Sequence, residues 1–147
     1  MKFLVLNGPN LNLLGLREPE LYGVENYAAL EKSIQNAGKA AGVEVTIIQS
    51  NHEGVLVDEI QNAYGRFDGI VINAAAYSHT SIAILDALKA VGIATAEVHL
   101  TDITAREAFR RRSFVSLYAL KTFMGRGFLS YRDAIFFLKN YLSDKAV

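Results

Sequence analysis

The segment GIVINAAAYSHTSIAILDALKAVGIATAEVH, residues 69–99, has the pattern of a strand, a helix and a second strand. Residues 69–73 and 94–98 are short and almost continuously apolar, which is typical of strands buried on both faces of a parallel sheet. Between them, apolar side chains recur at helical spacing at Ile82, Leu85 and Leu88. Strand, crossover helix and strand form the repeating unit of a parallel sheet, so this segment predicts an α/β fold.

The same alternation continues on both sides of this segment. Residues 2–7, 43–49 and 118–124 are further strand-like runs. Three more apolar stripes with helical spacing consist of Tyr27, Leu30, Ile34, Ala37 and Ala41, of Leu56, Ile60, Ala63 and Phe67, and of Tyr131, Ile135, Leu138 and Leu142. We therefore predict one α/β domain over residues 1–147, with a flavodoxin-like, doubly wound parallel sheet of five strands in the order 2-1-3-4-5 and helices on both faces.

Residues that favour helix ends flank two of the predicted helices. Asn26 directly precedes the first of the three stripes and Gly42 directly follows it, as expected for an N-cap and a glycine stop. Thr80 or Ser81 can cap the helix that carries Ile82. These residues predict where the two helices begin and where the first of them ends.

The composition excludes several classes of function. Fifteen Lys and Arg residues balance fifteen Asp and Glu residues, so no net field attracts nucleic acid or an acidic membrane. The absence of cysteine excludes disulfides, thiolate metal sites and a thiol nucleophile, and fits the cytoplasm. No signal-peptide core precedes the first strand, and no apolar run approaches the roughly 20 residues that cross a bilayer. We expect a cytoplasmic protein that binds neither nucleic acid nor membrane.

Residues 8–25 form a long segment without periodicity. It contains both prolines of the chain, Pro9 and Pro19, together with Gly15 and Gly23. Loops longer than about 12–15 residues are uncommon in compact domains and usually act as lids or binding loops. This segment follows the first strand beside the predicted switch point, where open α/β sheets bind their ligands. We therefore predict a lid over a binding site.

Polar and ionisable residues gather at the same edge of the predicted sheet. Glu97 and His99 stand two apart at a strand end, so their side chains point the same way. The other members of this group are Asn7, Asn10, Arg17, Tyr22, Asn73, His79, Arg106, Arg110, Arg111 and Arg112. Each has a simpler role when taken alone: an asparagine as a turn former, Glu97 as a buried carboxylate, an arginine as part of a solvated patch. Their coincidence at one edge favours a site.

The motifs that are missing limit the chemistry of this site. The first strand is not followed by GxGxxG, and no P-loop or GxSxG sequence occurs. The three histidines lack metal-site spacing, so neither a metal nor an organic cofactor is predicted. The residues that remain suit general acid–base chemistry on a small polar substrate.

Three alternatives remain open on these grounds. A flavin-binding electron carrier shares the fold but needs a phosphate loop where this chain has GPNLN. A receiver-like signalling domain needs aspartates where this chain has Asn7 and Asn73, although Lys121 fits its pattern. An inactive homologue of an enzyme is the third.

Four stretches of the chain carry a resemblance to a known family. They are NGPNLNLLGLREPELYG (7–23), QSNHEG (49–54), INAAAYSHTSIAILDAL (72–88) and EVHLTDITAREAFRRRS (97–113). In these stretches the sequence resembles the type II 3-dehydroquinate dehydratases over essentially its whole length. The resemblance implies the dehydration of 3-dehydroquinate to 3-dehydroshikimate without a cofactor, in either aromatic biosynthesis (the shikimate pathway) or quinate breakdown. It also implies a homo-oligomer, a dodecamer built from trimers.

The resemblance assigns a role to individual residues. Tyr22 resembles the base that removes a proton beside the ketone, and Arg17 the partner that makes this tyrosine more acidic. Asn10 resembles the residue that holds a water against the enolate oxygen. His99 resembles the acid that protonates the departing hydroxyl, and Glu97 the residue that orients it. Further positions resemble substrate-binding residues: Asn73, His79, Leu100, Thr101, Arg110 and, at a neighbouring subunit's site, Asp86.

The sequence departs from the family pattern at several positions. No proline or glycine follows Asn73, and Thr101-Asp102 stands where Ser-Asn is typical. Thr104 replaces a common histidine, and RRRS at residues 110–113 replaces a version that contains histidine. These differences leave the substrate affinity and the pH profile open but not the reaction class, and none removes a residue assigned to the chemistry.

Overall fold

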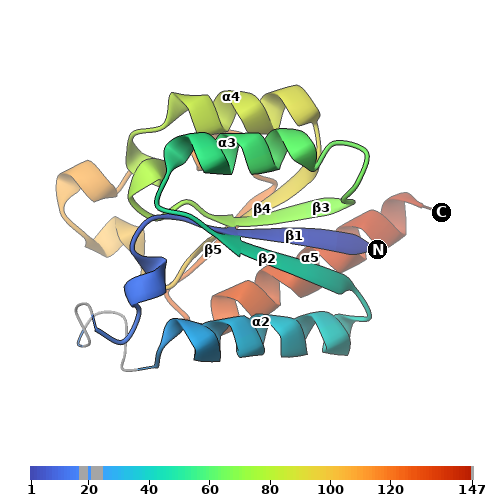
Figure 1. Ribbon diagram of the computed structural model, residues 1–147, viewed down its shortest axis with the longest axis horizontal. Coiled ribbons are helices and arrows are strands. Elements are labelled where there is room, and N and C mark those ends of the chain that lie inside the picture. Colours follow the sequence, from blue (N-terminus) through green and yellow to red (C-terminus); the bar gives the residue numbers. More distant parts are fainter. Residues whose placement is uncertain (17–19, 21–24, 147) are drawn as a thin grey trace.

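The computed structural model describes residues 1–16, 20 and 25–146. Its centre is a five-stranded parallel sheet in the order β2-β1-β3-β4-β5, which confirms the predicted topology. The strands are β1 (Lys2–Asn7), β2 (Glu44–Gln49), β3 (Gly69–Asn73), β4 (Ala94–His99) and β5 (Lys121–Met124). Helices cover both faces of the sheet, as Figure 1 shows.

Two helices pack on each face and divide the core in two. One face carries α2 (Tyr27–Ala41) and α5 (Leu129–Lys145), and the other carries α3 (Glu53–Asn62) and α4 (Ile82–Val91). Side chains alternate along β1, so Phe3 and Val5 join the core under α2 and α5. Leu4 and Leu6 join the core under α3 and α4. Burial on both sides explains why the strands are continuously apolar in sequence.

The residues at the predicted helix ends act largely as expected. The Asn26 side chain accepts a hydrogen bond from the Ala29 N–H at 2.9 Å, and Gly42 ends α2 in the left-handed conformation with φ 70°. Of the two residues proposed to cap α4, Ser81 does so, because its hydroxyl accepts from the Ile84 N–H at 3.0 Å. These caps satisfy backbone groups that the helix itself leaves unpaired.

Some predicted element boundaries were wrong. β5 begins at Lys121 rather than at residue 118, because residues 115–117 form a short 3-10 helix and Tyr118 follows it. The Tyr118 hydroxyl donates a hydrogen bond to the Ile93 carbonyl at 2.9 Å, and this contact holds the Tyr118 side chain outside β5. α3 ends at Asn62, although the stripe continues through Ala63 and Phe67, because the chain turns through Gly65 with φ 73°. β2 begins one residue later than predicted and β4 extends one residue further, to His99.

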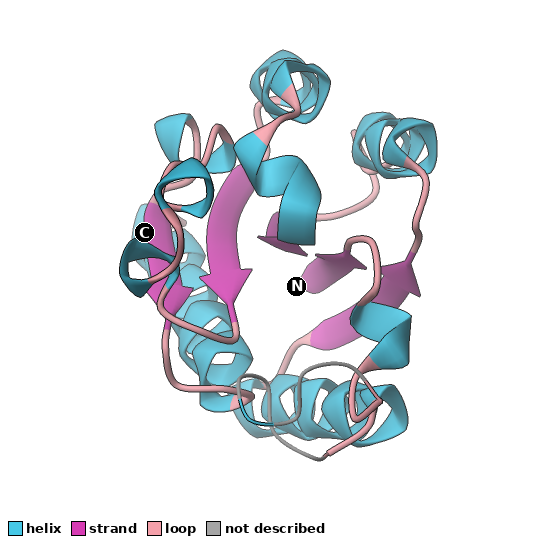
Figure 2. Ribbon diagram, turned by 90° about the vertical axis from the view of Figure 1, so that its left-hand side faces the viewer, coloured by secondary structure: helices cyan, strands magenta, loops and turns pink. Residues whose placement is uncertain are grey.

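The carboxyl ends of the strands bring the predicted site residues to one edge. Asn7 pairs with Asn73 across β1 and β3, and Ile72 pairs with Glu97 across β3 and β4. Figure 2 faces this edge. Gly8 lies so close to β3 that a Cβ atom there would be 2.4 Å from the Ala74 carbonyl oxygen, so only glycine fits where the chain leaves β1.

The segment predicted as a lid contains some regular structure. A 3-10 helix (Leu11–Leu13) begins directly after Asn10, which has a left-handed conformation with φ 68°. Leu11 and Leu14 are buried against the core under α2 and α5. Arg17 and Tyr22 lie outside the described residues. None of the described helices is both long and apolar enough to cross a membrane.

Candidate active site

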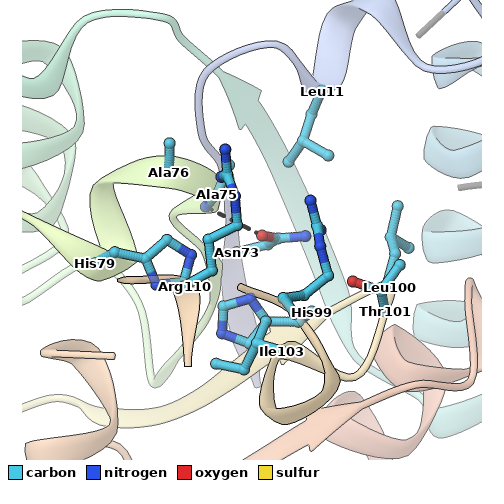
Figure 3. Close-up of a pocket in the computed structure, with 11 residues that line it drawn as sticks. Leu11, Asn73, Ala75, Ala76, His79, His99, Leu100, Thr101, Ile103 and Arg110 are labelled. Carbon is cyan, nitrogen blue, oxygen red and sulfur yellow. Dashed lines mark hydrogen bonds between the residues drawn. The ribbon is translucent and has the colours of Figure 1, made fainter. Parts of the chain in front are cut away.

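A pocket opens at the carboxyl edge of the sheet, beside the point where the strand order reverses. It is formed by the ends of β3 and β4 and by the segments that follow β1, β3 and β4 (Figure 3). Its lining residues are Leu11, Asn73, Ala75, Ala76, His79, His99, Leu100, Thr101, Ile103, Arg106 and Arg110. This position is the one where open α/β sheets bind their ligands.

His99 and Glu97 form a buried pair at the end of β4. The His99 Nε2 lies 2.8 Å from Glu97 Oε1, and the two residues are 5% and 0% exposed. A carboxylate can only accept a hydrogen bond, so Nε2 carries the proton of this contact. Nδ1 is therefore the His99 atom that remains for proton exchange in the pocket.

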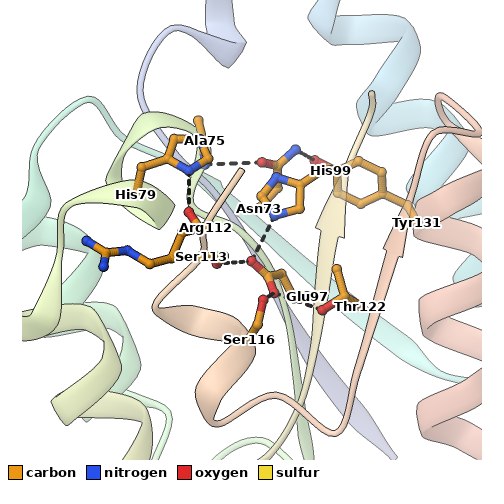
Figure 4. A network of polar contacts seen from close by, with 10 residues as sticks. All are labelled: Asn73, Ala75, His79, Glu97, His99, Arg112, Ser113, Ser116, Thr122 and Tyr131. Carbon is orange, nitrogen blue, oxygen red and sulfur yellow. Dashed lines mark hydrogen bonds and ion pairs between the residues drawn. The ribbon is translucent and has the colours of Figure 1, made fainter. Parts of the chain in front are cut away.

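His79 lies beside His99 in the same pocket. The two rings stack with centroids 6.5 Å apart and planes inclined by 16°. His79 Nδ1 is 2.7 Å from the Arg112 carbonyl oxygen, which can only accept, so Nδ1 is protonated (Figure 4). The Nε2 of His79 is then the atom available to a ligand.

Glu97 accepts hydrogen bonds from three hydroxyl groups as well as from His99 (Figure 4). Ser116 Oγ donates to Oε2 at 2.5 Å and Thr122 Oγ1 donates to the same oxygen at 2.9 Å. Ser113 Oγ donates to Oε1. Burial opposes ionisation, but the hydrogen bonds and charge of His99 and the hydroxyls outweigh it, so the pKa of Glu97 is lowered. Glu97 is thus a buried negative charge that holds the His99 ring in place.

We expect Glu97→Gln to lower the free energy of unfolding by about 1–3 kcal/mol at neutral pH, because a glutamine cannot accept all four hydrogen bonds. The pKa of Glu97 is lower in the folded protein than in the unfolded chain. Its ionised form therefore stabilises the fold fully above the unfolded pKa of about 4.3, and this contribution is lost as the pH falls through the folded pKa. Urea unfolding over a pH series should show the difference between the two proteins shrinking in acid.

Glu107→Gln is the matched control for this measurement. Glu107 is an exposed carboxylate paired with Arg110, and exposed pairs contribute little to stability. A stability difference between Glu97→Gln and the parent protein that stays constant throughout the acidic range would contradict the role given to the Glu97 charge.

Two guanidinium groups, those of Arg106 and Arg110, make the pocket suitable for an anionic ligand. The Arg110 Nε lies 3.0 Å from Glu107 Oε2, and the Arg106 Nε lies 3.8 Å from the same oxygen. Arg106 and Arg110 line the pocket, whereas Glu107 does not. A ligand carboxylate inside the pocket would therefore lie near the two arginines. Arg111 and Arg112 are exposed and fit the simpler interpretation of a solvated basic patch.

Asn73 lines the pocket, and its side-chain amide is held by two hydrogen bonds. Its Oδ1 accepts from the Ala75 N–H at 3.1 Å, and its Nδ2 donates to the Tyr131 hydroxyl at 2.9 Å. Figure 4 shows this amide between Ala75 and Tyr131. Asn73 is thereby held in one orientation, with an amide edge facing the pocket.

Most of the described residues predicted for the site meet in this pocket: Asn73, His79, His99, Leu100, Thr101 and Arg110 line it, and Glu97 lies directly behind His99. Asn10 does not line it. Its side chain is exposed, and its backbone N–H donates to Asn51 Oδ1 at 3.0 Å. Asp86 is exposed on α4 and is also outside the lining.

Two of the departures from the family pattern prove to be linked. Asp102 Oδ1 accepts from the Thr104 N–H at 2.9 Å and from its hydroxyl at 2.6 Å. These bonds lower the pKa of Asp102. The extra carboxylate is therefore engaged by its own turn, and it does not line the pocket.

Several residues of the site were missed in the sequence. Thr122 is paired with Glu97 in the sheet, so the register of β5 carries the signal for it once the strand order is known. Ser113 and Ser116 lie in an irregular segment, and no sequence periodicity indicates them. Among the described residues, no group of three or more His, Asp or Glu side chains is arranged to hold a metal ion.

Comparisons with known proteins show which family this chain is similar to. The family model described as dehydroquinase class II matches residues 1–139. A 3-dehydroquinate dehydratase of Clostridium acetobutylicum is 48% identical over 143 residues, which cover 97% of this chain and 99% of the relative. The corresponding protein of Dinoroseobacter shibae is 50% identical over 135 residues, which cover 92% and 90%.

A crystal structure shows the same likeness in three dimensions. The type II dehydroquinase of Butyrivibrio crossotus superposes with a TM-score of 0.91 at 47% identity, covering 94% of this chain and 97% of that one. The matches in sequence and in structure each span nearly the whole chain. The chain therefore belongs to the class II dehydroquinase family.

Proposed function

We propose that this protein catalyses the dehydration of 3-dehydroquinate to 3-dehydroshikimate by acid–base chemistry without a metal or organic cofactor. The observation that carries the proposal is the buried Glu97–His99 pair, which presents a histidine to a pocket lined by two arginines. Relatives at 48–50% identity bear the name 3-dehydroquinate dehydratase. A carboxylate substrate suits the arginines, and a departing hydroxyl requires an acid such as His99.

His99 is the proposed general acid. Protonated on both nitrogens, it donates its Nδ1 proton to the hydroxyl on the carbon β to the ketone, so that water leaves as the C–O bond breaks. The lowered pKa of Glu97 keeps its carboxylate ionised, and this charge lies 2.8 Å from the Nε2 of the proposed acid. Glu97 thus orients the ring and places a negative charge beside it.

Tyr22, Arg17 and Asn10 are proposed to act at the other end of the reaction. Tyr22, as a phenolate, removes a proton from the carbon next to the ketone, and the electron pair of that bond forms an enolate. Arg17 favours the phenolate by its positive charge. Asn10 holds a water against the enolate oxygen, and it immediately precedes Leu11, which lines the pocket. Collapse of the enolate expels the hydroxyl that His99 protonates and forms a double bond conjugated with the ketone.

The remaining lining residues are proposed to hold the substrate. Thr101 and the backbone at Leu100 suit its carboxylate, together with the charge of Arg110. Asn73 and His79 suit the ring hydroxyls, because the amide and the His79 Nε2 offer a donor and an acceptor. The cytoplasmic location expected from the cysteine-free sequence belongs to the same proposal.

The direct test is to add 3-dehydroquinate and follow the ultraviolet absorbance of the conjugated product. The protein is first dialysed exhaustively against a chelator, and full activity is expected to remain. No product from the folded protein would overturn the proposed reaction and favour an inactive homologue. Activity that is lost on dialysis and restored by added metal would overturn the cofactor-free mechanism alone.

We also propose a homo-oligomer, a dodecamer built from trimers, in which Asp86 reaches the pocket of a neighbouring subunit. Asp86 is exposed on α4 and does not line the pocket of its own chain, which fits this role. Sedimentation is expected to show an assembly rather than a monomer, and Asp86→Ala is expected to lower kcat/KM. Asp58→Ala, at an exposed carboxylate on α3, is the control that should leave activity unchanged. Fully active monomers would contradict this arrangement.

A further inference from the structure

Tyr131 lies inside the protein directly behind the candidate active site. It is a residue of α5 with no exposed surface, and its ring belongs to the core under α2 and α5. Its hydroxyl reaches the carboxyl edge of the sheet, where it contacts both Asn73 and Asn7. An apolar ring of the same size fills a core equally well, so packing alone does not account for this hydroxyl.

Each group around the Tyr131 hydroxyl has a fixed role as a hydrogen-bond donor or acceptor. Burial raises the pKa of Tyr131, so its hydroxyl keeps the single proton that it can donate. That proton goes to Asn7 Oδ1, at 2.7 Å, while the oxygen accepts from Asn73 Nδ2 at 2.9 Å. The Asn7 Nδ2 in turn donates to the Tyr27 hydroxyl at 3.3 Å. Each of these three contacts joins one donor to one acceptor.

The same contacts prevent the Asn73 amide from turning over. In the reversed orientation its NH₂ group would face the Ala75 N–H, which places two donors together. Its oxygen would face a tyrosine hydroxyl whose only proton is already bonded to Asn7. Both contacts of the reversed amide would leave buried polar groups unpaired, so the observed orientation of Asn73 is strongly favoured.

We infer that Tyr131 is a positioning residue that fixes the Asn73 amide so that its second Nδ2 hydrogen is presented to a hydroxyl or carbonyl oxygen of the substrate. This inference rests on the proposed function, in which Asn73 binds the substrate. Among the described residues, the second hydrogen has no partner, and Asn73 lines the pocket. The buried chain thereby connects the core to the recognition of the substrate.

Tyr131→Phe tests this inference by removing one oxygen atom and keeping the ring. The amide then loses its acceptor and its orientation, so KM for 3-dehydroquinate is expected to rise about tenfold, the effect of losing one hydrogen bond to the substrate. The value of kcat should change much less, and the pH profile of kcat should stay in place, because His99 and Glu97 are untouched. An unchanged KM in the folded variant would overturn the inference.

Tyr118→Phe is the matched control. The Tyr118 hydroxyl donates a hydrogen bond to the Ile93 carbonyl at 2.9 Å, as the Tyr131 hydroxyl donates one to Asn7. Ile93 lies just before β4 begins, away from the carboxyl edge of the sheet. This variant loses a comparable bond and is expected to keep the KM of the parent protein. Equal rises in KM in both variants would show a general loss of stability and would overturn the inference.

A double-mutant cycle distinguishes an effect through Asn73 from any other effect. If Tyr131 acts only by orienting Asn73, adding Tyr131→Phe to Asn73→Ala should change kcat/KM less than twofold. A further tenfold loss in that background would overturn the inference. Turnover by the parent protein is measured beside every variant, so a failure of the proposed function would be seen there first.

Asn7→Ala provides a second route if Tyr131→Phe does not fold. It keeps the tyrosine ring and frees the hydroxyl proton, which can then be donated to Asn73 Oδ1 when the amide is reversed, so that the reversed orientation becomes less unfavourable. KM is expected to rise in the same direction, by a smaller factor than in Tyr131→Phe. An unchanged KM in the folded Asn7→Ala protein would overturn the inference.

Discussion

Replacing His99 with alanine is expected to leave the protein folded and to lower kcat by about 10²–10⁴-fold, the usual contribution of a positioned general acid. The departing hydroxyl is a poor leaving group, and the proposed acid that protonates it is His99, which Glu97 holds at the pocket. The assay is the initial rate of product absorbance at saturating substrate, so that a change in binding does not obscure the change in kcat.

The fold should survive this substitution because Glu97 keeps most of its partners. Ser113, Ser116 and Thr122 still donate to its two oxygens after the imidazole is removed. A carboxylate with three hydroxyl donors is not left as an unpaired buried charge, which is the circumstance that destabilises proteins strongly. Circular dichroism and urea unfolding should therefore show a native-like His99→Ala protein.

His52→Ala is the control for this experiment. His52 is exposed, precedes α3 and does not line the pocket, so its removal should leave kcat unchanged. Added imidazole is expected to restore part of the activity of His99→Ala, because it can enter the vacated space and carry the proton. Near-normal turnover of a folded His99→Ala protein would assign the acid to another group.

The topology of the sheet could be predicted because strands buried on both faces have an almost continuously apolar sequence. β1 and β3 are apolar along almost their whole length, and the intervening helices show the opposite, one-sided pattern. The start of β5 was predicted wrongly for a physical reason. Tyr118 and Leu120 are apolar enough for a strand, but Tyr118 is held by the carbonyl of Ile93 before the strand begins. Such a long-range contact leaves no periodic signal.

The site was predictable where it is built from strand ends. Glu97 and His99 share a strand face, and their hydrogen bond follows from a spacing of two residues. Ser113 and Ser116 were not predictable, because an irregular segment brings their hydroxyls to Glu97. Tyr131 was correctly predicted as a member of an apolar stripe, but the stripe does not indicate which groups its hydroxyl contacts. Helical periodicity reports the burial of a side chain and not the partner of its polar atom.

Tyr22→Phe is expected to leave KM close to that of the parent protein and to lower kcat by at least about 10²–10⁴-fold, because the ring remains while the proposed base is lost. A free phenol has a pKa near 10, so a small fraction, about 0.1%, is ionised at neutral pH. A nearby guanidinium, here proposed to be that of Arg17, lowers the pKa of an acid by about 1–3 units, which increases the share of the reactive phenolate.

The pocket also contains an alternative candidate for the catalytic base, so the Tyr22→Phe result distinguishes between two residues. Among the described lining residues, His79 and His99 are the only histidines, and His99 is the proposed acid. His79 has its Nδ1 hydrogen bonded to the Arg112 carbonyl, so its Nε2 is a possible base. His79→Gln, measured beside Tyr22→Phe, is expected mainly to raise KM, as suits a residue that holds a substrate hydroxyl. If Tyr22→Phe keeps most of its turnover while His79→Gln loses it, the base is His79 and not Tyr22.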